Sequence, residues 1–164
     1  MTRALVIRSD GSMPFVRDIP KGETLSVIKD VIGSPRGMWF DCVRGPLVHG
    51  YVNDTGIIDG LMLNPLASIL LGHIICGDVI LFGSLSPRGE HRTTFSLNDE
   101  YVDHEYDVPD SVVDEIRNNW NLWQTSLDAH AAKLELEDYY RVHGRSAREN
   151  EWCALWGSNP GPAD

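Results

Sequence analysis

The sequence lacks the features that mark secreted, membrane-spanning and metal-stabilised proteins. Its three cysteines, Cys42, Cys76 and Cys153, lie far apart and form no CxxC pair, so we expect neither a disulfide framework nor a zinc site. The longest apolar run, 66–76, is too short to cross a membrane. The first apolar run, 4–7, is too short for a secretory signal. We therefore expect a protein of the reducing cytoplasm.

Positive charge is scarce as well. The chain of 164 residues has 14 Lys and Arg against 24 Asp and Glu, which gives a net charge of −10. Direct binding to nucleic acid is not expected, because affinity for phosphates requires an excess of positive charge. Residues 99–138 hold twelve acids and only two bases, and the rest of the chain is balanced. One segment therefore carries the whole net charge.

Motifs for common cofactors and catalytic mechanisms are missing. The sequence has no P-loop, no GxGxxG and no GxSxG. Its six histidines show neither HxH nor HxxxH spacing. His104 lies in the acidic run DHEYD, but an extended chain would send alternate residues of that run to opposite faces. We therefore expect no catalytic residue, no metal and no cofactor, with an enzyme that uses His104 as one alternative.

The apolar pattern predicts an α+β fold. Alternating and continuous apolar segments indicate strands over 3–8, 13–19, 38–43, 47–52 and 78–82. Helices are expected over about 23–32 and from Asn64-Pro65 to Gly72, because Asn caps helices well and Pro suits their first position. The order is ββαββαβ, with a mixed or antiparallel sheet, and an edge strand over 93–97 is possible in addition. The predicted parts are an α+β domain over 1–98, an acidic helical segment over 99–143 and a tail over 144–164 that contains two tryptophans.

The helical segment poses a problem of length. A straight helix over 109–143 would measure about 50 Å, whereas the preceding unit should be only about 25 Å across. We expect the helix either to break, near Asn118-Asn119 or Ser126, or to pack its overhang on a second chain. The second possibility predicts a homodimer. Its contact residues would be Leu134, Leu136, Tyr139 and Tyr140.

A series of turn, cap and strand residues resembles a known family. These residues are Ala4 to Arg8, Asp10-Gly11, Tyr51-Val52-Asn53, Gly56, Gly60-Leu61, Asn64-Pro65, Ala67, Gly77-Asp78-Val79-Ile80 and Gly83. Together they are similar to the signature of domain-of-unknown-function family 3846, over about residues 1–84. The resemblance implies no activity and no catalytic residue. It implies an origin in phages or mobile elements, particularly of actinobacteria, and a small host-facing protein that acts by binding.

The leading hypothesis is a non-enzymatic protein that binds and modulates a host protein through an acidic surface. A defence or nucleic-acid-handling factor would offer the basic surface that such a protein needs. The residues expected to form the acidic surface are Asp99, Glu100, Asp103, Glu105, Asp107, Asp110, Asp114 and Glu115.

The alternative hypothesis is a protein that binds or sequesters a small nucleotide-like anion. Arg88, His91 and Arg92 follow the last core strand and could bind such an anion at a loop. An enzyme of unknown reaction is the second alternative.

Overall fold

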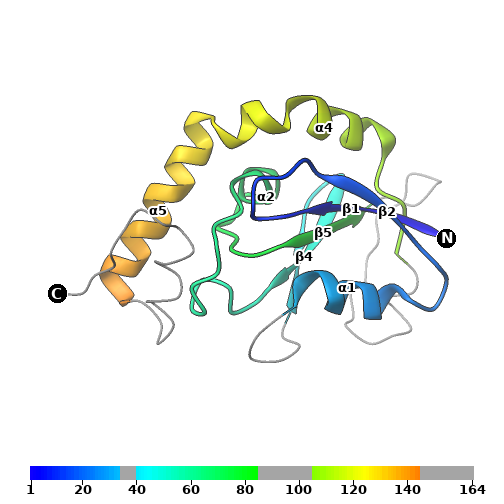
Figure 1. Ribbon diagram of the computed structural model, residues 1–164, viewed down its shortest axis with the longest axis horizontal. Coiled ribbons are helices and arrows are strands. Elements are labelled where there is room, and N and C mark those ends of the chain that lie inside the picture. The colour runs from blue at the N-terminus through cyan, green and yellow to red at the C-terminus, as the bar shows by residue number, and fades with distance from the viewer. Residues whose placement is uncertain (34–39, 85–104, 145–164) are drawn as a thin grey trace.

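The computed structural model describes residues 1–33, 40–84 and 105–144, and it confirms the α+β fold (Figure 1). The elements follow the predicted order ββαββαβ and are succeeded by two helices. They are β1 (Thr2–Ile7), β2 (Phe15–Ile19), α1 (Thr24–Ile32), β3 (Phe40–Arg44), β4 (Val48–Asn53), α2 (Pro65–Leu71), β5 (Val79–Gly83), α4 (Asp110–Gln124) and α5 (Leu127–His143). Among the described helices, none is long and apolar enough to cross a membrane.

The five strands form one sheet in the order β2-β1-β5-β4-β3, and every pairing is antiparallel. Of the two expected sheet types, the chain therefore adopts the antiparallel one. All five residues of β5, the central strand, are buried, which explains its unbroken apolar sequence. The possible edge strand over 93–97 lies outside the described residues.

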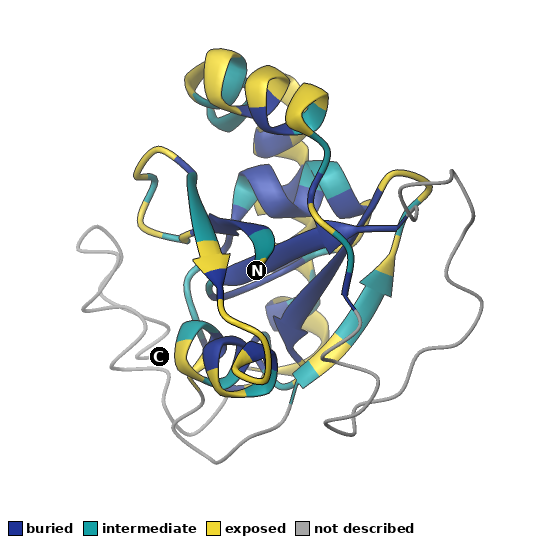
Figure 2. Cartoon of the chain, turned by 90° about the vertical axis from the view of Figure 1, so that its right-hand side faces the viewer, coloured by how far each residue is buried: buried dark blue, intermediate teal, exposed yellow. Residues whose placement is uncertain are grey.

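Helices cover both faces of the sheet (Figures 1 and 2). Along β1, Leu5 and Ile7 point into an apolar cluster beneath α2 and α4, whereas Ala4 and Val6 point into a second cluster against α1. This alternation follows from the two-residue period of a strand. Each face of the sheet thus has its own apolar core, with α1 on one side and α2 and α4 on the other.

The break between α4 and α5 falls at Ser126, one of the two positions expected. The Ser126 hydroxyl accepts a hydrogen bond from the Ala129 amide and so caps α5. α5 then packs on α2 of the same chain, with Leu136 and Tyr140 in a third apolar cluster beside Cys76. α5 therefore buries part of its apolar surface within its own chain, whereas Leu134 stays 51% exposed.

Residues 105–108, which we call the anchor segment, tie α4 to the sheet. The Gly83 amide donates to the Tyr106 carbonyl at 3.0 Å, and the Val108 amide donates to the Arg3 carbonyl at 2.9 Å. A Cβ atom at Gly83 would lie only 2.1 Å from the Asp107 carbonyl oxygen. Only glycine lets the anchor segment cross the end of β5 this closely.

Gly83→Ala should therefore destabilise the fold far more than an alanine at an uncrowded glycine. Because the clash is with backbone, we expect a loss of about 3 kcal/mol or more in the free energy of unfolding. Gly22→Ala is the control, since Gly22 has a φ of 86° and no atom near its Cβ position; it should cost about 1 to 2 kcal/mol. Urea denaturation measures both values, and equal losses would contradict the close crossing at Gly83.

Candidate functional site

The outer surfaces of α4 and α5 are rich in carboxylates. Both helices bury an apolar stripe, for example Val113 and Ile116 on α4, so that the acidic residues between these positions face solvent. We define the acidic face as the exposed carboxylates of Asp107, Asp110, Asp114, Glu115, Asp128, Glu135, Glu137 and Asp138. The two helices carry only three basic residues other than histidine, Arg117, Lys133 and Arg141.

Two members of the acidic face also bind the N-terminal strand. The Arg3 amide donates to the Asp107 carboxylate at 2.8 Å. The Arg3 guanidinium lies 2.6 Å from the Asp110 carboxylate and forms a salt bridge with it. The hydrogen bond to Asp110 raises the pKa of Arg3. These contacts fix the start of α4 against β1.

Five other members of the acidic face lack a salt bridge in the part of the chain that the structure describes. Within the described part of the chain, none of the carboxylates of Asp114, Glu115, Asp128, Glu135 and Glu137 forms a salt bridge. Carboxylates without a local counter-charge maintain a negative potential over the surface that bears them. These five residues can therefore attract a positively charged partner.

Glu105 does not belong to the acidic face, although the sequence predicted that it would form part of the acidic surface. Its side chain is buried, and the residue is only 6% exposed. The carboxylate lies 2.5 Å from His49 Nε2, and the Tyr51 hydroxyl donates to its other oxygen at 2.5 Å. The physical reason is the path of the anchor segment, which turns Glu105 inward onto β4. The acidic run is therefore not a uniformly solvated linker.

Ser84 completes the buried network around His49. The Ser84 hydroxyl donates to the Gly45 carbonyl at 2.9 Å and lies 3.4 Å from His49 Nδ1. Serine, histidine and carboxylate also occur together in hydrolases. Here all of these side chains are buried, and the network joins the anchor segment to β4.

Sequence reasoning missed this network, although one signal for it exists. His49 and Tyr51 are two residues apart on a strand and therefore share a face. A histidine and a tyrosine on the buried face of a strand require hydrogen-bond partners. The partner, Glu105, lies 56 residues from His49, and no local pattern relates the two.

The other predicted site residues have three different outcomes. Leu136 and Tyr140 are buried in the core of their own chain, and the Tyr140 hydroxyl donates to the Ile57 carbonyl at 2.7 Å. Tyr139 is half-buried, and Leu134 is 51% exposed. Three groups of predicted residues lie outside the described residues: the acidic residues Asp99, Glu100 and Asp103, the anion-site residues Arg88, His91 and Arg92, and His104.

Across 1–33, 40–84 and 105–144, no three His, Cys, Asp or Glu side chains gather where they could hold a metal ion.

Replacing Glu105 should unfold the protein much more easily than replacing an exposed glutamate. Glu105→Ala removes the hydrogen bonds that the buried carboxylate makes with His49 and Tyr51, which should cost about 1 to 3 kcal/mol for each of these two buried groups. Glu115→Ala is the matched control and should change the free energy of unfolding by no more than about 0.5 kcal/mol. Denaturant melts compare the two variants. If Glu105→Ala proved as mild as Glu115→Ala, the buried network would not hold the fold together.

The two described cysteines should differ in reactivity. Burial raises the pKa of the Cys76 thiol to about 12, so near pH 8 only about one thiol in ten thousand is ionised. Cys42 is half-buried on β3. In a Cys153→Ser background, iodoacetamide should label Cys42 well before Cys76, because the thiolate is the reacting form. Mass spectrometry after brief labelling measures both rates, and comparable rates would argue against the burial of Cys76.

Comparison with known proteins identifies a family for most of the chain. The family model described as "Domain of unknown function (DUF3846)" matches residues 1–107. The matched range is longer than the range of about 1–84 over which the sequence resembled this family. It includes Glu105 and most of the anchor segment. No curated protein and no solved structure matches the chain. The chain belongs to the DUF3846 family of domains of unknown function.

Proposed function

We propose that this chain is a non-enzymatic binding protein of a phage or mobile element. In this proposal it acts in the host cytoplasm and docks its acidic face on a basic surface of a host protein. The observation that carries the proposal is the set of five exposed carboxylates without a salt bridge in the described residues, which lie on α4 and α5. A defence factor or a nucleic-acid-handling protein has a basic surface of the required kind.

The rigidity of the two helices supports this proposal. α4 is fixed at its start by the anchor segment and by the Arg3–Asp110 salt bridge, and α5 packs on α2. Figure 2 shows the outer surface of α4 exposed on the side that faces away from the sheet. Carboxylates on a fixed scaffold lose little conformational freedom when a partner binds, so more of their interaction energy contributes to affinity.

Charge also favours a different protein over a second copy as the partner. A homodimer through α5 would bring two acidic surfaces together, and like charges in contact oppose association. Of the four residues expected at a dimer contact, two are buried, which leaves Leu134 and the exposed part of Tyr139. The proposal therefore takes a basic host protein as the main partner.

Removing two charges from the acidic face should weaken the binding of this partner. The test variant is Asp114→Asn/Glu115→Gln on α4, and the control is Glu23→Gln/Asp30→Asn at the N-cap of α1 and within α1, which changes the net charge equally on the opposite face but also removes the Arg17–Asp30 salt bridge. We expect wild type and control to retain a host protein from lysate at low salt and to release it at high salt. The affinity of the purified pair should fall roughly tenfold in the test variant alone.

Two outcomes would contradict the proposal. One is a partner that binds wild type and the test variant equally, as measured by calorimetry with purified proteins. The other is a capture that is insensitive to salt, because an interaction dominated by exposed charges must weaken as ionic strength rises.

A further inference from the structure

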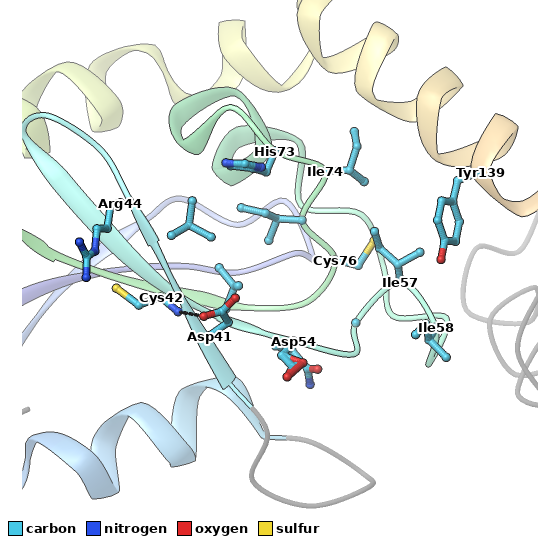
Figure 3. Close-up of a pocket in the computed structure, with 15 residues that line it drawn as sticks. Asp41, Cys42, Arg44, Asp54, Ile57, Ile58, His73, Ile74, Cys76 and Tyr139 are labelled. Atoms are coloured by element: carbon cyan, nitrogen blue, oxygen red, sulfur yellow. Dashed lines mark hydrogen bonds between the residues drawn. The ribbon is translucent and has the colours of Figure 1, made fainter. Parts of the chain in front are cut away.

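The inner side of α5 is occupied by contacts with its own chain. Ala132, Leu136 and Tyr140 lie in the third apolar cluster. Figure 3 shows the ring of Tyr139 pointing from α5 into a cavity of about 440 Å³ at the β3 edge of the sheet. Any partner of α5 must therefore bind its outer side.

The outer side of α5 carries a line of exposed apolar residues, which we call the outer stripe: Leu127, Ala131, Leu134 and Val142. Leu127 is 87% exposed, Leu134 51% and Val142 67%. The steps of four and three residues from Leu127 to Leu134 place these side chains on one face of the helix. Single exposed leucines are common on protein surfaces. Leucines aligned along one helix face instead form a continuous line that another helix can cover.

Carboxylates flank the outer stripe on both sides. Asp128 and Glu135 each follow a leucine of the stripe by one residue and lie on one side of it. His130 and Glu137 lie on the other side, at the positions that flank a coiled-coil contact. None of these three carboxylates forms a salt bridge within the described residues. The apolar line therefore has acidic borders.

The two bases of α5 leave these borders acidic. Arg141 forms a salt bridge with Asp138. Lys133 lies in line with Tyr140, seven residues further along, and therefore on the far side of the helix from the outer stripe. Neither base lies beside the leucines.

Charge decides what kind of helix can cover the outer stripe. In paired helices the charges beside the apolar line determine which partner is accepted. A second copy of α5 is disfavoured, because Asp128 and Glu135 would face their own copies in an antiparallel pair and Asp138 would face itself in a parallel pair. A helix with lysines or arginines beside its own apolar line would meet opposite charge on both sides.

We propose that the outer stripe docks an amphipathic helix of the host partner that has basic borders. The apolar side chains of this helix pack on Leu127 and Leu134, and its lysines or arginines pair with Asp128, Glu135 and Glu137. Such docking rests on the proposed function, because it specifies the kind of segment through which a basic host protein contacts α5. The carboxylates then attract the partner, and burial of the leucines adds to the affinity.

Three synthetic peptides test this docking with the full chain, each of about 20 residues so that it can form a helix. The first has leucines at alternating steps of three and four with lysines beside them. The second has the same composition in an order that removes the apolar line, and the third has glutamates in place of the lysines. In calorimetry we expect the first to bind with a Kd in the micromolar range, the second at least about tenfold more weakly, and the third not to bind. Equal binding of the first two peptides would overturn the proposal, as would no binding of the first.

The variant Leu127→Gln/Leu134→Gln tests the residues, because glutamine keeps a high helix propensity and adds no charge. It should weaken binding of the first peptide at least about tenfold, and Leu134→Gln alone should weaken it severalfold. The control Leu47→Gln removes a leucine of the same exposure as Leu134, 50% against 51%, in the turn between β3 and β4. The control should bind the peptide like wild type, and urea denaturation checks that each variant is folded. Peptide binding that the two α5 variants leave unchanged would refute the proposal.

The results also separate this docking from the proposed function. If the α5 variants bind the first peptide like wild type while Asp114→Asn/Glu115→Gln loses affinity for a host protein, the docking is wrong and the proposed function stands. If the first peptide binds at the outer stripe while capture of host protein is insensitive to salt, the docking surface stands and the proposed function is wrong. Sedimentation that showed a dimer of the full chain, lost in Leu134→Gln, would overturn the docking, because a second copy would then cover the outer stripe.

Discussion

The buried carboxylate of Glu105 is the constraint on which the arrangement of this molecule depends. A carboxylate away from water is costly unless its oxygens have partners. His49 and Tyr51 supply one partner to each oxygen. This network holds the anchor segment over the ends of β5 and β1, and the anchor segment in turn sets where α4 begins. The position of the C-terminal helices thus depends on an interaction made inside the sheet domain.

The same constraint divides the acidic part of the chain into residues with different roles. Glu105 is internal and structural, and Asp107 and Asp110 bind Arg3 at the junction with β1. Five carboxylates farther along α4 and α5 face solvent and have no salt bridge among the described residues: those of Asp114, Glu115, Asp128, Glu135 and Glu137. A run of acids that looks uniform in composition therefore contains a buried anchor, a junction and a charged surface. Only the last of these can attract a partner without disturbing the fold.

The acids on α4 and α5 lie on exposed helix surfaces, where they act together over a distance and their effect is screened by salt. This geometry suits a large basic partner.

Local features of the sequence determined the types and order of the elements. The alternation in β1 and the Asn64-Pro65 helix start each depend on neighbours within a few residues, and each was predictable. Ser126 was one of two positions expected for a break in the C-terminal helix. The size and location of the acidic segment were also evident. Only the tertiary structure decided that Glu105 turns inward to His49 and that Leu136 and Tyr140 are buried. These outcomes depend on contacts between distant segments, which the path of the chain decides and local periodicity does not encode.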